Sequence, residues 1–174
     1  MHRVHLAIAL LAAAAPALAR AKPWQGVTPG STTSSELTAK FGPPSTQGKL
    51  GGRTAYVYKD EAAIGATRQA QFFAREDGVI VEIVVFPSAR IEAEAVEGSY
   101  GKPTRKAFTD DLRPVWYYPA AGITVFFGKA GTVESMSFKP SEGSRPREAG
   151  PHAAAPARGT GAAESGAPEG AAEQ

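Results

Sequence analysis

Residues 33–44 read Thr-Ser-Ser-Glu-Leu-Thr-Ala-Lys-Phe-Gly-Pro-Pro, and they predict a short helix with both ends marked. Thr33 and Glu36 have the spacing of a capping box, in which a hydroxyl accepts from a backbone amide and a carboxylate reaches back to the helix start. Leu37 and Phe41 lie four residues apart and share one helical face. The glycine after Phe41 suits a C-cap, and the two prolines prevent the helix from continuing.

A second stretch, residues 90–103, reads Arg-Ile-Glu-Ala-Glu-Ala-Val-Glu-Gly-Ser-Tyr-Gly-Lys-Pro and predicts a similar helix with a similar end. Three strand patterns follow each helix. One such unit is too small to bury a sound core alone. We therefore predict an α+β fold in which two tandem αβββ repeats, at about 28–87 and 88–140, form a six-stranded antiparallel sheet with both helices on one face.

Alternation along the expected strands divides their side chains between two faces. The face toward the helices is predicted to hold Leu37, Phe41, Tyr56, Tyr58, Phe73, Ile83, Val85, Val96, Tyr100, Trp116, Tyr118, Ile123, Val125, Phe127, Met136 and Phe138. The opposite face would be open and unusually apolar, and exposed apolar surface commonly marks a partner site. Its predicted partner-binding residues are Val57, Phe72, Val84, Phe86, Tyr117 and Phe126. Cover by the C-terminal tail, the N-terminal segment or a second copy is the alternative for this face.

The two ends of the chain differ from this body in composition. Residues 1–21 have a basic start, an apolar run and small-residue cleavage positions after Ala19 and Ala21, which is typical of a secretory signal peptide. Residues 141–174 are rich in Gly, Ala, Pro and Glu, and such a segment is predicted to be disordered. The folded domain is therefore expected at 22–140. The apolar run is shorter than the ~20 residues of a membrane span.

Several functional classes lack their usual residues. The chain has no cysteine, and its three histidines, His2, His5 and His152, lie outside the expected body, so the body has neither a usual nucleophile–base pair nor N/S ligands for zinc. Without cysteine there is also no lipoprotein anchor. The net charge is only +2 and shows no basic stripe, which disfavours nucleic-acid binding. We predict a protein that is not an enzyme and holds no metal or cofactor.

A family resemblance fits the same residues. The motif that starts at Pro29 as Pro-Gly-Ser-Thr-Thr and continues through Phe-Gly-Pro-Pro, Tyr-Val-Tyr and Asp-Gly-Val-Ile resembles the SmpA/OmlA (BamE-like) family. The tandem arrangement resembles the β-lactamase inhibitor protein, which presents a sheet to its target. The resemblance implies a role in outer-membrane assembly, although this chain lacks the anchoring cysteine of that family and the disulfides of the inhibitor.

The leading hypothesis is an exported, periplasmic or secreted, non-catalytic module that binds a protein of the cell envelope, with an outer-membrane component as one candidate partner. The alternative is a secreted inhibitor of an enzyme that uses the same face plus the loop 59–67, six residues longer than its counterpart in the second unit. A glycan or small-ligand binder that uses Trp116 and the tyrosines ranks third.

Overall fold

Helix α1 (Ser34–Phe41) begins and ends where its sequence predicts. The Thr33 side chain accepts from the backbone amide of Glu36, while the carboxylate of Glu36 accepts from the amide of Thr33 at 2.7 Å. Gly42 follows with a φ of 78°, and its amide donates to the carbonyl of Thr38. Helix α2 (Ala93–Tyr100) ends in the same way at Gly101, with a φ of 77°.

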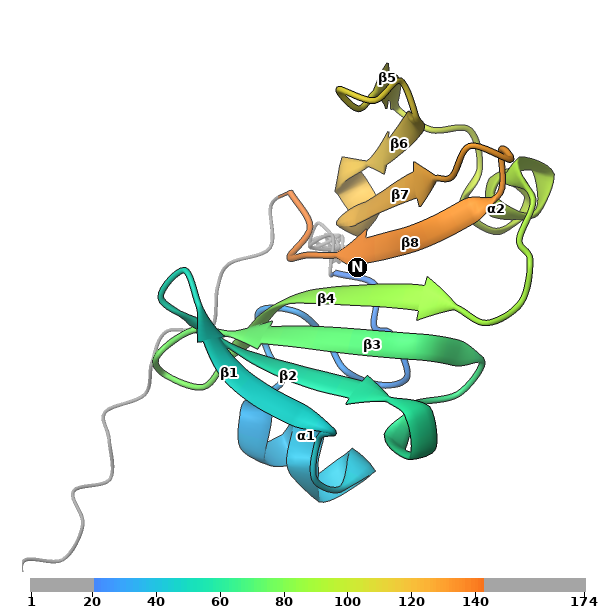
Figure 1. The fold of residues 1–174 in the computed structure, drawn as a ribbon. Coiled ribbons are helices and arrows are strands. Elements are labelled where there is room, and N and C mark those ends of the chain that lie inside the picture. Colours follow the sequence, from blue (N-terminus) through green and yellow to red (C-terminus); the bar gives the residue numbers. More distant parts are fainter. Residues whose placement is uncertain (1–20, 143–174) are drawn as a thin grey trace, which may run out of the picture.

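The computed structural model describes residues 21–142, and these form one eight-stranded antiparallel sheet with two short helices (Figure 1). The order across the sheet is β1-β2-β3-β4-β8-β7-β6-β5. The strands are β1 (Thr46–Leu50), β2 (Arg53–Lys59), β3 (Thr67–Ala74), β4 (Ile80–Pro87), β5 (Arg105–Phe108), β6 (Pro114–Tyr118), β7 (Ile123–Phe127) and β8 (Val133–Phe138).

The predicted six-stranded sheet of two αβββ repeats is wrong. The structure is mostly β, with four strands after each helix. The sequence did not reveal β1 or β5 because both are edge strands. Every residue of β1 is exposed, and β5 is exposed except at Ala107. Such strands form through backbone hydrogen bonds to one neighbour, so their side chains need not alternate between apolar and polar.

The core lies between the helices and one face of the sheet. Leu37 and Val96 are the buried residues of the two helices. An aromatic cluster surrounds Phe72, whose ring centroid lies 5.6 Å from that of Tyr58, 6.3 Å from Phe41 and 5.9 Å from Trp24. In the other half of the sheet, Trp116 and Phe127 are buried as predicted, with ring centroids 4.8 Å apart.

The placement of Phe72 on the open face is therefore wrong, since this side chain is fully buried. Phe72 pairs with Tyr56 and Ile83, which face the helices, whereas Phe73 pairs with Ala55 and Glu82 on the opposite face. Two adjacent phenylalanines leave the alternation ambiguous, and an error of one residue moves every side chain of a strand to the other face.

Two tyrosines tie the helix ends to the sheet. The hydroxyl of Tyr58 donates to the carbonyl of Gly42 at 3.0 Å, and that of Tyr118 donates to the carbonyl of Gly101 at 3.2 Å. Each bond satisfies a carbonyl that the helix itself leaves without a partner. Both helices are thereby fixed on the same face of the sheet.

The ends of the described chain also pack onto the body. The backbone N–H of Lys22 donates to the carbonyl of Ala121 at 3.3 Å, and the ring of Trp24 packs against that of Phe72. The N-terminal segment therefore contacts both halves of the sheet. At the other end of the described chain, Ser141 is buried. The rest of the predicted signal peptide and tail, residues 1–20 and 143–174, lies outside the described residues.

We expect Phe72→Ala to lower the free energy of unfolding by about 3–5 kcal/mol, because it leaves a large cavity in a buried aromatic cluster. Phe126→Ala, at a half-buried position, should cost less than about 2 kcal/mol. Urea denaturation of the two variants measures both values. Equal losses would contradict the assignment of these two residues to different faces.

Candidate functional site

The face of the sheet opposite the helices carries a continuous row of paired residues. Directly paired residues of an antiparallel sheet point to the same face. Following the register from strand to strand, the row runs Val57, Gln71, Val84, Ser137, Thr124, Tyr117. It crosses from β4 to β8 without a break, so the two halves of the sheet present one surface. We call this row, together with Phe86 and Phe126, the open face.

Five of the six predicted partner-binding residues lie on this open face, and Phe72 does not. Val57, Val84, Phe86, Tyr117 and Phe126 are all half-buried. These side chains are therefore less exposed to solvent than an uncovered sheet face predicts, because neighbouring side chains on a twisted sheet cover part of each residue.

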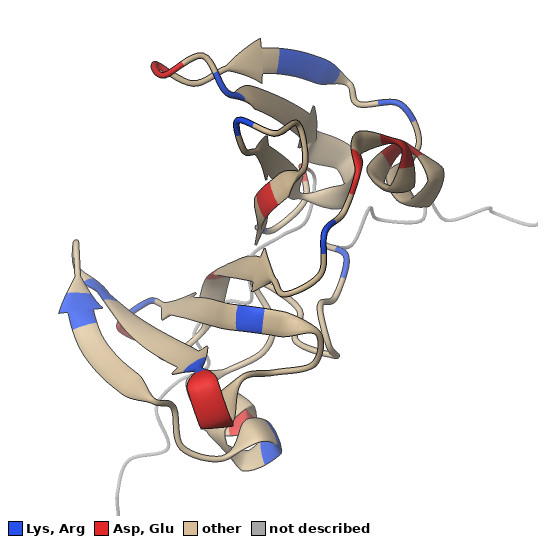
Figure 2. Cartoon of the chain, turned by 45° about the vertical axis from the view of Figure 1, so that its right-hand side comes forward, with Lys and Arg blue, Asp and Glu red and all other residues tan. Residues whose placement is uncertain are grey.

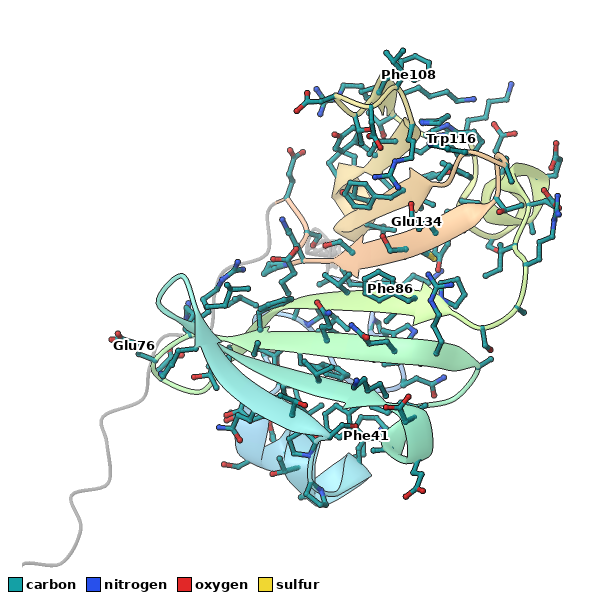
Figure 3. The ribbon with its side chains drawn as sticks, in the orientation of Figure 1. Phe41, Glu76, Phe86, Phe108, Trp116 and Glu134 are labelled. Carbon is teal, nitrogen blue, oxygen red and sulfur yellow. The ribbon has the colours of Figure 1, made fainter. Side chains whose placement is uncertain are left out.

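Phe86 and Phe126 come from the two halves and line one hollow of about 170 Å³. Figure 3 shows Phe86 on β4 beside Glu134 on the neighbouring strand β8. The remaining lining residues are Thr109, Arg113, Phe127, Glu134 and Ser135. The hollow thus combines aromatic walls with polar groups at its rim.

The charges at this hollow compensate one another. Nε of Arg113 lies 2.6 Å from Oδ2 of Asp111, and Nη1 of Arg113 contacts the carboxylate of Glu134. A guanidinium already paired with two carboxylates offers little attraction to a further anion. The hollow therefore suits a neutral or weakly cationic side chain better than a phosphate or a carboxylate.

The open face also holds a half-buried carboxylate, Glu82, that the sequence analysis did not single out. The side chain of Glu82 is 15% exposed. Its carboxylate oxygens lie 2.9 Å from Nη1 of Arg53 and 3.3 Å from Nζ of Lys139. The hydroxyl of Ser137 donates a third contact at 3.0 Å. Burial alone would raise the pKa of Glu82, but the hydrogen bond from Arg53 and the charge of Lys139 outweigh burial and lower it. The sequence carries one sign of this group, since Glu82 is the single acidic residue in the otherwise apolar strand 79–86.

The loop 59–67, proposed as part of an inhibitory surface, is anchored at its middle and exposed on either side. It contains a 3₁₀ helix at Asp60–Ala62, and Ile64 is buried in the core. The Thr67 hydroxyl donates to the Ile64 carbonyl at 2.7 Å. The extra residues therefore close one end of the core.

Metal-ligating groups do not converge within residues 21–142. No group of three His, Cys, Asp or Glu side chains there could hold a metal ion. Asp77 stabilises the β3–β4 turn. Its carboxylate accepts from the guanidinium of Arg75 at 2.6 Å and from the backbone amide of Val79 at 3.0 Å. No helix in the described part of the chain is both long enough and apolar enough to cross a membrane.

The sequence matches no protein-family model and shows no significant match to a curated protein. Among solved structures, a DUF4309 family protein, YjgB, from Bacillus subtilis has a TM-score of 0.51 at 18% identity, over 67% of this chain and 84% of that chain. This likeness concerns the fold alone.

Two further structures are more distant. A cysteine-rich secretory protein from Staphylococcus aureus has a TM-score of 0.44 at 16% identity, over 64% of this chain and 43% of that chain. An extracellular protein containing a SCP domain from Bacillus anthracis has a TM-score of 0.46 at 16% identity, over 62% of this chain and 42% of that chain. None of the three is described as SmpA/OmlA, so that resemblance stays a prediction.

The lowered pKa of Glu82 predicts a pH-dependent contribution to stability. The charged form stabilises the fold, so this contribution is present above the ordinary pKa of 4.5 and is lost as the pH falls through the lower folded value. Because Arg53 and Lys139 are 40% and 58% exposed, we expect Glu82→Gln to cost only about 1 kcal/mol at pH 7.

Urea denaturation of Glu82→Gln and of the wild-type chain between pH 3 and pH 7 tests this. The difference between them should shrink as the pH falls. Glu61→Gln, on the exposed side of the 3₁₀ helix, is the matched control and should follow the wild type throughout. A constant difference for Glu82→Gln would contradict the assigned linkage.

Proposed function

We propose that this chain is an exported, non-catalytic module that binds a protein partner through its open face. The observation that carries the proposal is the continuous row from Val57 to Tyr117, with Phe86 and Phe126 beside it. No helix of residues 21–142 packs on that face, because the two tyrosine bonds fix both helices on the other side. Export rests on the composition of residues 1–21, which is typical of a secretory signal peptide.

The chemistry of the face favours a protein over a small ligand. Half-buried aromatic residues are the usual hot spots of protein interfaces, and they contribute most where a polar surround excludes water. Glu82 with Arg53 and Lys139 forms such a polar group near the middle of the face. Trp116, considered as a glycan platform, is 8% exposed and belongs to the core. A second candidate, an inhibitor of an enzyme, would use the same open face plus the loop 59–67, in which Lys59, Asp60 and Glu61 are exposed.

Photocrosslinking in the native host tests the site. A benzoylphenylalanine placed at Gln71, within the row, should give a discrete protein adduct that mass spectrometry identifies. The double variant Tyr117→Ala and Phe126→Ala should abolish that adduct while the chain stays folded by circular dichroism. The same crosslinker at Ala39, exposed on α1, is the control and should give no such adduct. An adduct that survives the double variant, or one that forms equally from Ala39, would remove the open face from the proposal.

A further inference from the structure

Strand β5 (Arg105–Phe108) forms one outer edge of the sheet and pairs only with β6. In an antiparallel strand, alternate N–H and C=O groups point away from the paired neighbour. An outer strand therefore presents a row of backbone groups to which an extended segment can add as another strand.

The β5 edge carries uncompensated positive charge. Lys102, Arg105 and Lys106 are all exposed, and no ion pair joins any of them to an acid within residues 21–142. Figure 2 shows this basic colour along β5, the uppermost strand of that view. A negatively charged partner is the complement of this edge.

Two of these cations are held in place by aromatic rings. The Arg105 guanidinium lies 4.1 Å from the Tyr117 ring centroid, and the Lys106 ammonium lies 4.1 Å from that of Trp116. Tyr117 belongs to the open face, whereas Trp116 faces the core, so the two cations stand on opposite sides of β5. Cation–π contacts restrict the motion of long side chains and so lower the entropy lost on binding.

An exposed apolar group completes the edge. Phe108 is 69% exposed at the end of β5 and lies at the far end of the β5–β6 hairpin (Figure 3). It shares a side of the strand with Lys106, two residues earlier. The following turn is fixed, since the Thr109 amide donates to the Arg113 carbonyl at 2.9 Å.

Protection against aggregation is the ordinary reason for basic residues on an edge strand. That reason does not account for Phe108, because a large exposed aromatic ring on the same edge promotes association. The opposite edge, β1, has the single cation Lys49 and no aromatic residue. The combination of cations, an aromatic anchor and a free backbone edge is therefore particular to β5 among the described strands.

We propose that the β5 edge binds an extended acidic peptide segment of a partner protein as a ninth, antiparallel strand of the sheet. Two consecutive acidic residues of the peptide pair with Arg105 and Lys106, one on each side of the strand. A residue two positions before them is apolar and packs on Phe108. This edge adjoins the open face, since Arg105 stacks on Tyr117 and Thr109 lines the hollow, but the proposal does not require a partner on the open face.

The test uses the chain after its signal segment, labelled with ¹⁵N, and a capped peptide Thr-Val-Thr-Glu-Glu-Thr as the probe. Saturable shifts are expected for the amides of Arg105 to Phe108, and they should weaken with added salt because the ion pairs are exposed. The double variant Arg105→Glu and Lys106→Glu should weaken binding by about tenfold. Phe108→Ala should weaken it to a lesser extent.

Lys49→Glu, the same charge reversal on the β1 edge, is the matched control and should leave the affinity unchanged. A peptide with Lys-Lys in place of Glu-Glu should not bind. Shifts centred on β1 or on the open face would overturn the proposal, as would no saturable shift at millimolar peptide. A third outcome would also overturn the proposal: the chain binds phosphatidylglycerol vesicles, the double variant does not, and the peptide causes no shifts. That result would assign the edge to anionic lipid.

Discussion

Three residue pairs between β4 and β8, Ile83 with Phe138, Val84 with Ser137 and Val85 with Met136, join the two halves of this protein into one sheet. Each half has one short helix and four strands, and a unit of that size buries a smaller share of its surface than the joined sheet does. The junction makes the core continuous on one side, where Ile83 and Val85 pack among buried residues from both halves. On the other side it makes the open face continuous, since Val84 and Ser137 are adjacent members of its row.

Polar contacts reinforce this junction. Glu82 on β4 accepts from Ser137 and pairs with Lys139 beyond β8, and it also pairs with Arg53 at the start of β2. One carboxylate thus links three strands on the open face. On the helix side, the segment from Lys22 to Trp24 reaches both halves. The relative position of Phe86 and Phe126, on which the hollow depends, is set by contacts on both sides of the sheet.

The two surfaces proposed for partner binding differ in their chemistry. The open face is broad and half-buried, and its central charges are paired, so shape and apolar contact would dominate recognition there. The β5 edge is narrow and exposed, and no acid of residues 21–142 pairs with its cations, so backbone hydrogen bonds and electrostatic attraction would dominate there. A protein with both surfaces can hold a folded partner on one and an extended segment on the other.

The sequence by itself determined the local features, because these depend on residues close together in the chain. The capping box at Thr33, the glycine ends of both helices and the β3–β4 turn at Gly78 agree with the structure. Alternation in β2, β4, β6 and β7 also placed the core side chains on the face toward the helices, and it placed five of the six predicted partner-binding residues on the opposite face.

Only the tertiary structure decided the strand number, the register of β3 and the fate of Glu82. Edge strands such as β1 keep their side chains in water and show no apolar pattern in the sequence. Adjacent Phe72 and Phe73 fit either face by sequence, and pairing with Tyr56 and Ile83 puts Phe72 on the face toward the helices. Glu82 is separated from Arg53 and Ser137 by many residues, so no local pattern could show that its charge is compensated. Long-range strand pairing brings these groups within hydrogen-bonding distance. Patterns of neighbouring residues in a single sequence do not contain that pairing.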